Sequence, residues 1–385
     1  MSLFETKPAP KIHFGPGAIN TVDSEVHLIG AKRILIVTDP GIMHVGHPGN
    51  LRLHLEDQGC KVEIFDRVVE NPTTETVADC VETARKFGAE LLIGLGGGSS
   101  MDTAKGCNFI LTNGGEMKDY WGHARADKPM LPLIAIPTTA GTGSECQSYA
   151  LISDAETHQK MACGDPKALA VAAILDPTLT LTQPQFVTAC TGIDAISHAI
   201  ESAVTLRRTP FSGIYSRESF RLLQENLETV FEEPDNLHAR GQVLLGAAYA
   251  GIAIENSMLG CAHSAANPLT AHYGTVHGNA VGLTLPHAMV YNSKNPDALA
   301  IYARLALESR LAHRDDSEQE AFEALHARIL ELLDWVDFPL SLRDLKAEKS
   351  DIPMLAKEAA GQWTAQFNPR PITEEDFVKF YEAAY

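Results

Sequence analysis

The stretch "TGIDAISHAIES", residues 191–202, carries an acid and an imidazole within an otherwise apolar helical pattern. Asp194 and His198 stand four residues apart, so on a helix they share one face. A second apolar stretch, residues 260–292, holds four more imidazoles, those of His263, His272, His277 and His287. A single histidine in such a helix is more often a satisfied core residue. A cluster of them with a carboxylate is costly to bury unless the groups share a partner.

A divalent cation would be such a partner. Carboxylate oxygen and imidazole nitrogen together suit Fe(II), Zn(II) or Mn(II). The sequence therefore predicts a metal centre in its second half.

A glycine cluster in the first half, "IGLGGGSSMDTAKG" at 93–106, lies between a strand pattern and a helix pattern. Glycines let a backbone approach a ligand closely, and the free N–H groups of a helix start suit a pyrophosphate. Ser99 and Asp102 have the spacing of a capping box. The match to G-x-G-x-x-G is incomplete, because Ser99 stands where the third glycine would be. A structural turn and a phosphate site both fit this loop.

Two further features follow strand patterns at the same expected edge of a sheet, where open α/β sheets bind ligands. "PTTAGTGSE" at 137–145 offers small residues and hydroxyl groups. Asp39 ends an earlier strand pattern. Its carboxylate either accepts hydrogen bonds from an adenosine ribose, which favours NAD over NADP, or caps a turn before Pro40.

The secondary structure predicted to position these residues changes halfway along the chain, from alternating strands and helices to helices alone. Over residues 32–176, β-branched runs alternate with helical stretches, which predicts a parallel sheet with helices on both faces. We expect strands at 33–39, 61–65, 90–97, 132–137 and 171–177, a hairpin over 148–164, and helices at 41–59 and 74–88. Long helical patterns follow at 185–205, 211–231, 237–257, 262–272, 279–293, 296–312 and 317–336.

The predicted fold class is an α/β N-terminal dinucleotide-binding domain, residues 1–183, followed by an all-α C-terminal metal-binding domain, residues 184–385. The net charge of −18 opposes nucleic acid as a partner. No apolar run is long enough to cross a membrane, and the first residues do not have the pattern of a signal peptide. The seven cysteines are scattered without CxxC spacing, which favours free thiols in the cytoplasm.

Taken together, the motifs resemble the iron-containing (group III) alcohol dehydrogenase family. "GLGGGSSMDTAKG", "PTTAGTGSE", "TGIDAISHAIES" and the pattern H-x13-HGNAV-x4-PH at 263–287 occur in the family's order. The similarity runs from "IHFGPGA" near the start to "NPRP" at 368–371. The resemblance implies a dehydroquinate synthase-like architecture with the active site in the cleft between the two domains.

The resemblance also assigns residues. It places the metal ligands at Asp194, His198, His263 and His277. It places the cofactor positions at Asp39, Asn71, Gly97, Gly98, Ser99, Asp102, Thr138, Thr139, Thr142, Lys160 and Leu179. The implied cofactors are NAD, because an acid at position 39 is typical of members that use it, and Fe(2+), with Zn(2+) compatible with the same ligands.

One departure from the family concerns proton transfer. Many relatives carry a further histidine four residues after the third ligand, where this chain has Asn267. An imidazole relay through this position is therefore unavailable. No catalytic residue is assigned beyond the metal centre, and Asn267 and His272 are the candidates for a supporting role.

The implied activity is that of an NAD(H) alcohol dehydrogenase or aldehyde reductase. Hydride would pass between nicotinamide and a small primary alcohol or diol, with the metal polarising the substrate oxygen. Lys and Arg are absent from 241 to 293, so a phosphorylated substrate would lack partners there. This argues against one alternative, a sugar-phosphate cyclase (a lyase) of the same fold. The other alternative is a non-catalytic binding protein that has kept the fold.

The family is commonly a homodimer or a larger homo-oligomer, and we expect the same of this chain. "KIHFGPGA", residues 11–18, is interpreted as an N-terminal strand that pairs across such an interface.

Overall fold

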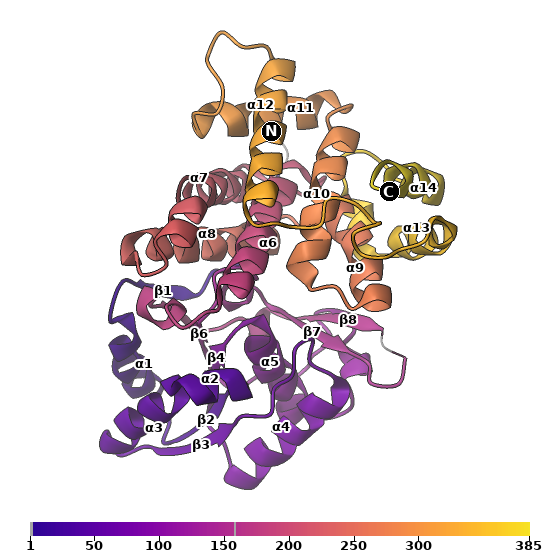
Figure 1. The fold of residues 1–385 in the computed structure, drawn as a ribbon. Helices are drawn as coiled ribbons and strands as arrows, with labels where there is room; N and C mark the ends of the chain where they lie inside the picture. Colours follow the sequence, from indigo (N-terminus) through magenta and orange to yellow (C-terminus); the bar gives the residue numbers. More distant parts are fainter. Residues whose placement is uncertain (1–2, 158) are drawn as a thin grey trace. The chain divides into compact units, whose positions relative to one another are not determined.

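The computed structural model describes residues 3–157 and 159–385, and the chain divides into two compact units. Lys7–Gln183 forms an α/β unit, drawn in indigo to magenta in Figure 1. Pro184–Tyr385 forms a helical unit, with which residues 3–6 group.

A six-stranded sheet of parallel neighbours forms the centre of the α/β unit, in the order β1-β9-β6-β4-β2-β3. The strands are β1 (Lys11–Phe14), β2 (Arg33–Val37), β3 (Lys61–Phe65), β4 (Leu91–Gly96), β6 (Leu133–Pro137) and β9 (Ala172–Leu175). Side chains alternate between the two faces of a strand, and in β2 both sets are apolar and buried. A strand buried on both faces is what a parallel sheet requires, and the predicted fold class is confirmed.

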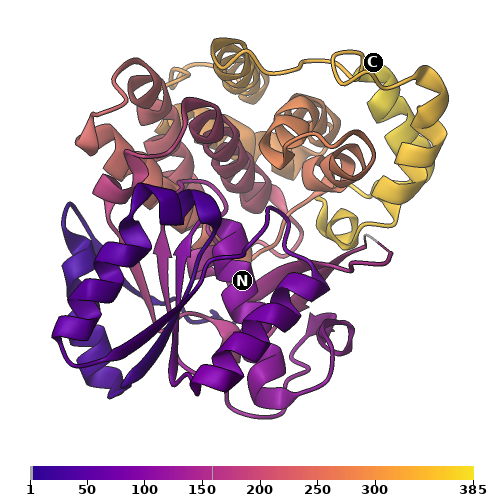
Figure 2. The same cartoon turned by 60° about the horizontal axis from the view of Figure 1, so that its bottom comes forward.

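Helices cover both faces of this sheet (Figure 2). One apolar core joins the sheet to α1 (Val22–Ile29) and α3 (His47–Asp57). The other joins it to α4 (Thr74–Phe87) and α5 (Gly98–Asn113). The single helix expected over 41–59 is wrong, because Gly46 ends α2 (Pro40–Val45) in the left-handed conformation at φ 90° and α3 begins after it.

A small second sheet carries the predicted hairpin. β7 (Tyr149–Ser153) and β8 (Lys160–Gly164) pair antiparallel, and β5 (Gly122–His123) joins β8. Within residues 11–18, β1 pairs in parallel with β9 of the same chain, with Lys11 opposite Ala172, and lies at the edge of the sheet. Pairing of this strand across an interface between copies of the chain stays a prediction.

The helical unit is arranged around α6. Its helices are α6 (Gln185–Val204), α7 (Pro210–Glu232), α8 (Leu237–Glu255), α9 (Cys261–Tyr273), α10 (His277–Asn292), α11 (Pro296–Glu308), α12 (Glu318–Trp335), α13 (Ile352–Ala360) and α14 (Glu374–Ala383). α6 contacts α7, α8, α10 and α11 and is buried over most of its length. The first seven helices match the predicted ones, whereas α13 and α14 were not predicted. In the described part of the chain no helix is long and apolar enough to span a bilayer.

Candidate functional site

Three imidazoles of the helical unit converge on one carboxylate oxygen, Oδ1 of Asp194. The Nε2 atoms of His198 and His263 each lie 3.4 Å from it, and Nε2 of His277 lies 3.9 Å away. The rings of His198 and His263 stack with their centroids 4.8 Å apart. α6 supplies Asp194 and His198, α9 supplies His263, and the first residue of α10 is His277. The structure thus brings together the four residues that the sequence assigned to a metal.

The geometry and the surroundings of this cluster fit a divalent ion. Ligands about 2.1 Å from a tetrahedral metal lie about 3.4 Å from each other. One ligand atom each from Asp194, His263 and His277 lies within 4.8 Å of the others. Oδ1 of Asp194 and Nε2 of His263 are buried and have no hydrogen-bond partner among the described residues. Buried polar atoms without a partner are costly, and a shared cation would satisfy both.

A fifth residue, Glu201, was missed from the sequence and contacts the ring of one of these candidate ligands, His263. Its Oε2 lies 2.6 Å from Nδ1 of His263, and its Oε1 accepts a hydrogen bond from the Ala262 backbone. A carboxylate on the far nitrogen of a histidine ligand fixes the ring and its tautomer. The sequence did contain the signal: Asp194, His198 and Glu201 follow the i, i+4, i+7 spacing of one helix face.

Electrostatics inside the cluster favour the charged forms. Burial raises the pKa of Asp194, but the imidazoles of His198, His263 and His277 outweigh it and hold that pKa well below its usual range. Burial lowers the pKa of His263, yet the Asp194 and Glu201 carboxylates outweigh this and raise it to about 9. The two buried carboxylates therefore require positive charge between them, which protons or a metal ion can provide.

Close backbone packing holds the ligand helices in place. A Cβ atom on Gly278, next to His277, would lie 2.2 Å from the carbonyl oxygen of Cys190 in α6. A Cβ atom on Gly260, just before α9, would lie 2.8 Å from Oδ1 of Asn368. Only glycine permits both approaches.

Asn368 comes from the "NPRP" motif near the C-terminus and ties it to the ligand helices. Its side chain accepts a hydrogen bond from the Cys261 backbone and donates one to Asn292. This gives the motif a structural role at the start of α9 and the end of α10.

The two candidates for proton transfer lie elsewhere on α9. Asn267, one turn after His263, donates a hydrogen bond to Oε1 of Gln362. His272 pairs with Glu358 of α13 at 2.9 Å. It lies nine residues after His263, about 13 Å along a helix axis. The structure does not bring His272 to the metal cluster.

In the α/β unit, the predicted cofactor loops meet at the carboxyl ends of adjacent strands. Gly96–Gly98 follow β4, and Thr138–Thr142 follow its neighbour β6. The Thr138 backbone donates a hydrogen bond to the Gly96 carbonyl. A Cβ atom on Gly98 would lie 2.8 Å from the Thr142 side chain, so glycine is required for the two loops to approach.

The start of α5 is available to an anion. Its N-cap is Gly97, and no side chain caps the helix. The capping box expected from Ser99 and Asp102 is therefore wrong. A helix start with no side-chain cap leaves backbone N–H groups for a phosphate. Oγ1 of Thr138 is also buried without a hydrogen-bond partner among the described residues.

Asp39 has one of the two roles considered for it, that of a cap, and recognition of the ribose stays a prediction. Oδ1 caps α2 by accepting from the Ile42 backbone, and Oδ2 lies 3.5 Å from the Ser100 hydroxyl. Asp102 is engaged inside the protein, because its oxygens accept from the Ser144 hydroxyl and the Leu151 backbone.

The remaining cofactor candidates are spread around this edge of the sheet. Lys160 donates to Oδ1 of Asn71, whose φ is 52°. Thr139 lies near Gly97, and Leu179 is buried in the short helix Pro177–Thr180 after β9. Ser99 lies in the first turn of α5.

Comparison with known proteins agrees with this arrangement. Residues 9–177 match the family described as "Iron-containing alcohol dehydrogenase", and residues 188–385 match "Fe-containing alcohol dehydrogenase family, C-terminal". The chain belongs to the iron-containing alcohol dehydrogenase family. The family resemblance found in the sequence is confirmed, and the chain is an alcohol dehydrogenase-type oxidoreductase.

Its relatives in this family share the full length of the chain. "Alcohol dehydrogenase 4" of Saccharomyces cerevisiae (strain YJM789) is 32% identical, over 98% of this chain and 97% of its own. "NAD-dependent methanol dehydrogenase" of Bacillus methanolicus is 32% identical, over 100% of each chain. The crystal structure of a 1,3-propanediol oxidoreductase superposes with a TM-score of 0.95 at 31% identity and covers 100% of each chain.

The Glu201–His263 contact makes a first prediction. Glu201→Gln places an amide between Nδ1 of His263 and the Ala262 N–H. An amide has only one oxygen, so its NH2 group must face one of these two N–H donors. We expect about a 10- to 100-fold loss of iron affinity, measured by metal analysis of anaerobically purified protein and by chelator competition. Glu358→Gln is the matched control, since Glu358 is exposed and contacts only His272 among the candidates. Equal iron retention in both variants would remove Glu201 from the site.

Gly278 makes a second prediction. Gly278→Ala must push the start of α10 from α6, so we expect His277 to shift, bound iron to fall and the melting temperature to drop. Gly49→Ala is the control, because a Cβ atom there meets nothing within 4 Å. A Gly278→Ala protein that keeps its full iron content would contradict the packing argument.

Proposed function

We propose that this chain is an NAD(H)- and iron-dependent dehydrogenase that interconverts small primary alcohols or diols with their aldehydes. The observation that carries the proposal is the convergence of three imidazole Nε2 atoms, 3.4–3.9 Å away, on one buried oxygen of Asp194. An oxygen and three nitrogens are a donor set suited to Fe(II).

Asp194, His198, His263 and His277 would hold the iron. When bound, the iron supplies Lewis acidity toward the oxygen of an alcohol or aldehyde. Glu201 would accept the Nδ1 proton of His263, which leaves the Nε2 lone pair of this ring for the iron. The low pKa of Asp194 keeps its carboxylate ionised.

The glycine and threonine loops of the α/β unit would hold NAD. Helix α5 begins without a side-chain cap, which suits the pyrophosphate. Asp39, with its Oδ2 on the same edge of the sheet as Gly97, would accept hydrogen bonds from the ribose and repel a 2′-phosphate. NAD is also the cofactor in the name of the methanol dehydrogenase relative.

A small, neutral substrate fits the composition of the metal-binding segment. Lys and Arg are absent from 241 to 293, the stretch that carries His263 and His277. A phosphate group would lack a cationic partner there. The related proteins named for methanol and 1,3-propanediol act on small alcohols, which also favours this class over the cyclase alternative.

Asn267 affects how protons leave the site. An amide can hydrogen-bond a substrate or a water molecule, but it cannot exchange a proton as an imidazole does. Its hydrogen bond to Gln362 fixes its orientation. The proton of the alcohol would therefore leave without a histidine at this position.

The location and assembly belong to the same proposal. We place the enzyme in the cytoplasm, because no disulfide joins the seven buried cysteines in the described structure. We expect a homodimer or larger homo-oligomer without nucleic-acid partners.

Turnover tests the reaction. Iron-loaded protein should oxidise NADH with small aldehydes, seen as loss of absorbance at 340 nm, and should reduce NAD with small alcohols. Chelation should abolish the activity and Fe(II) should restore it, while His277→Ala should remain inactive. No NADH change with any aldehyde or alcohol of a broad panel would contradict the proposal. Net NADH oxidation excludes both a lyase and a non-catalytic protein.

Asp39 tests the cofactor choice. Asp39→Ser keeps an oxygen that can cap α2 at the Ile42 N–H but removes the negative charge. We expect the ratio of kcat/KM for NAD to that for NADP to fall by about tenfold or more, since repulsion of the 2′-phosphate is lost. Asp57→Ser, at an exposed acid that ends α3, is the control. An unchanged ratio would remove Asp39 from the ribose site.

A further inference from the structure

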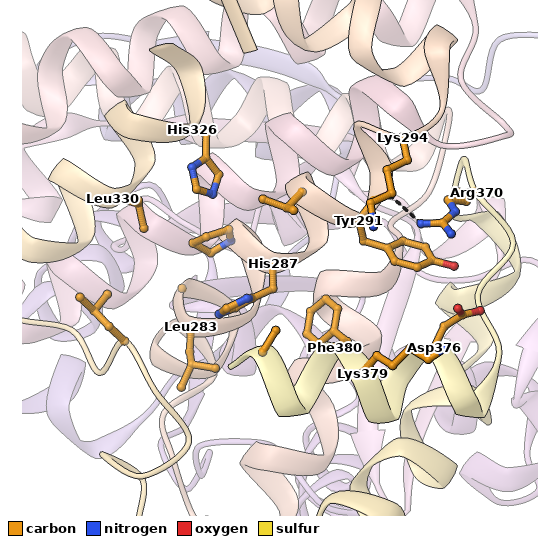
Figure 3. Close-up of a pocket in the computed structure, with 15 residues that line it drawn as sticks. Leu283, His287, Tyr291, Lys294, His326, Leu330, Arg370, Asp376, Lys379 and Phe380 are labelled. Carbon is orange, nitrogen blue, oxygen red and sulfur yellow. Dashed lines mark hydrogen bonds between the residues drawn. The ribbon is translucent and has the colours of Figure 1, made fainter. Parts of the chain in front are cut away.

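A cavity of 610 Å³ lies in the helical unit and does not use the metal ligands. It is lined by α10, α12 and α14 together with the loop residue Arg370 (Figure 3). Its middle is at His287, ten residues after His277 on α10 and hence about 15 Å along the helix axis. The volume is in the range of small-molecule pockets.

The two ends of this cavity differ in character. Figure 3 shows Lys294 and Arg370 at one end and Leu283 and Leu330 at the other. Lys379 of α14 adds a third cation to the lining. The chain has a net charge of −18, so a cavity lined by three cations is locally opposite in sign to the protein as a whole.

The lining also holds one acid, Asp376, whose carboxylate interacts with the charge of Arg370 and offsets one of the three cations, so an excess of positive charge remains. Asp376 is the third residue of the α14 capping box, where its Oδ2 accepts from the backbone and hydroxyl of Thr373. Arg370 is fixed in place: its guanidinium lies 3.9 Å from the centroid of the Tyr291 ring, and Nη1 donates to the Tyr291 carbonyl. The remaining donors of Arg370 stay available to a ligand.

Two imidazoles line the middle of the cavity and behave as neutral groups. Burial lowers the pKa of both His287 and His326 below its ordinary value. Nε2 of His326 is buried and has no hydrogen-bond partner in the described part of the chain. Neutral imidazole rings can pack against the apolar part of a ligand, and Nε2 of His326 can form one hydrogen bond with that ligand.

We propose that this cavity binds a small amphipathic anion, a monocarboxylate with an apolar chain. The carboxylate lies among Lys294, Arg370 and Lys379, and the chain extends past His287 toward Leu283 and Leu330. The cavity has its cations at one end and apolar side chains at the other, which matches a ligand with one anionic group on one apolar chain. A polyphosphate or a nucleotide would leave that apolar end unmatched. The site is separate from the metal centre and does not depend on the proposed reaction.

Calorimetric titration of iron-loaded protein tests the proposal, with octanoate as the probe. Acetate and 1-octanol serve as comparisons that keep only the charge or only the chain. The double variant Lys294→Glu/Lys379→Glu reverses two exposed charges of the lining, and Lys349→Glu does the same at an exposed lysine outside it. A second variant, Val290→Trp, fills the cavity from a half-exposed lining position.

We expect saturable binding of octanoate that is about tenfold or more tighter than that of acetate or 1-octanol. The double variant and Val290→Trp should each weaken it by about tenfold or more, with Lys349→Glu like the parent. Absent octanoate binding, or equal binding by the double variant and the parent, would overturn the proposal. A change of sedimentation coefficient in the pocket variants would also overturn it, because the occupant would then be a second copy of the chain.

Discussion

Burial of the Asp194 carboxylate among three imidazoles is the constraint on which the helical unit depends. Charged groups in an apolar interior are stable only when paired. Here the pairing partners come from three helices, so α6, α9 and α10 must meet within a few ångströms. The glycines at 260 and 278, where a Cβ atom would lie 2.8 Å or less from a neighbour, permit that approach. Glu201 and Asn368 then fix the start of α9.

The α/β unit is organised by a different constraint, the close approach of backbone to backbone at the carboxyl ends of β4 and β6. A fully buried lysine stabilises this region. Nζ of Lys105 in α5 donates to the carbonyl and hydroxyl of Ser144 and to the Tyr149 carbonyl. Asp102 accepts from the same Ser144 hydroxyl. The loop after β6 is therefore held to α5, and the glycine loop and the threonine loop keep a common position.

The sequence predicted long, strongly patterned elements well, because apolar residues that recur with a helix or strand period over many positions mark the buried face of that element. It gave β3 at its observed bounds, 61–65, and the first seven helices of the helical unit. It missed α13 and α14, which are only 9 and 10 residues long. It missed the break at Gly46, because a single glycine inside a helical pattern is tolerated as often as it ends a helix.

Candidate site residues could be named from the sequence where a family motif carries them, but not where the reason is a three-dimensional contact. Glu201 sits in the same quoted motif as Asp194, but its role depends on where α9 places His263. Ser99 had the right spacing for a capping box, yet α5 begins one residue before it, at Gly98. His272 was close to the ligands in sequence, but the helical rise carries it to Glu358 of α13.

Helix α10 connects two parts of the helical unit that the sequence shows only as one apolar run. Its first residue is His277, one of the four residues of the Asp194 cluster, and its later turns line the cavity with Leu283 and His287. Gly282, between them, has no room for a Cβ atom, which would lie 2.9 Å from the side chains of Leu333 and Phe338. The middle of α10 is therefore tightly packed, and this one helix positions both His277 and the residues that line the cavity.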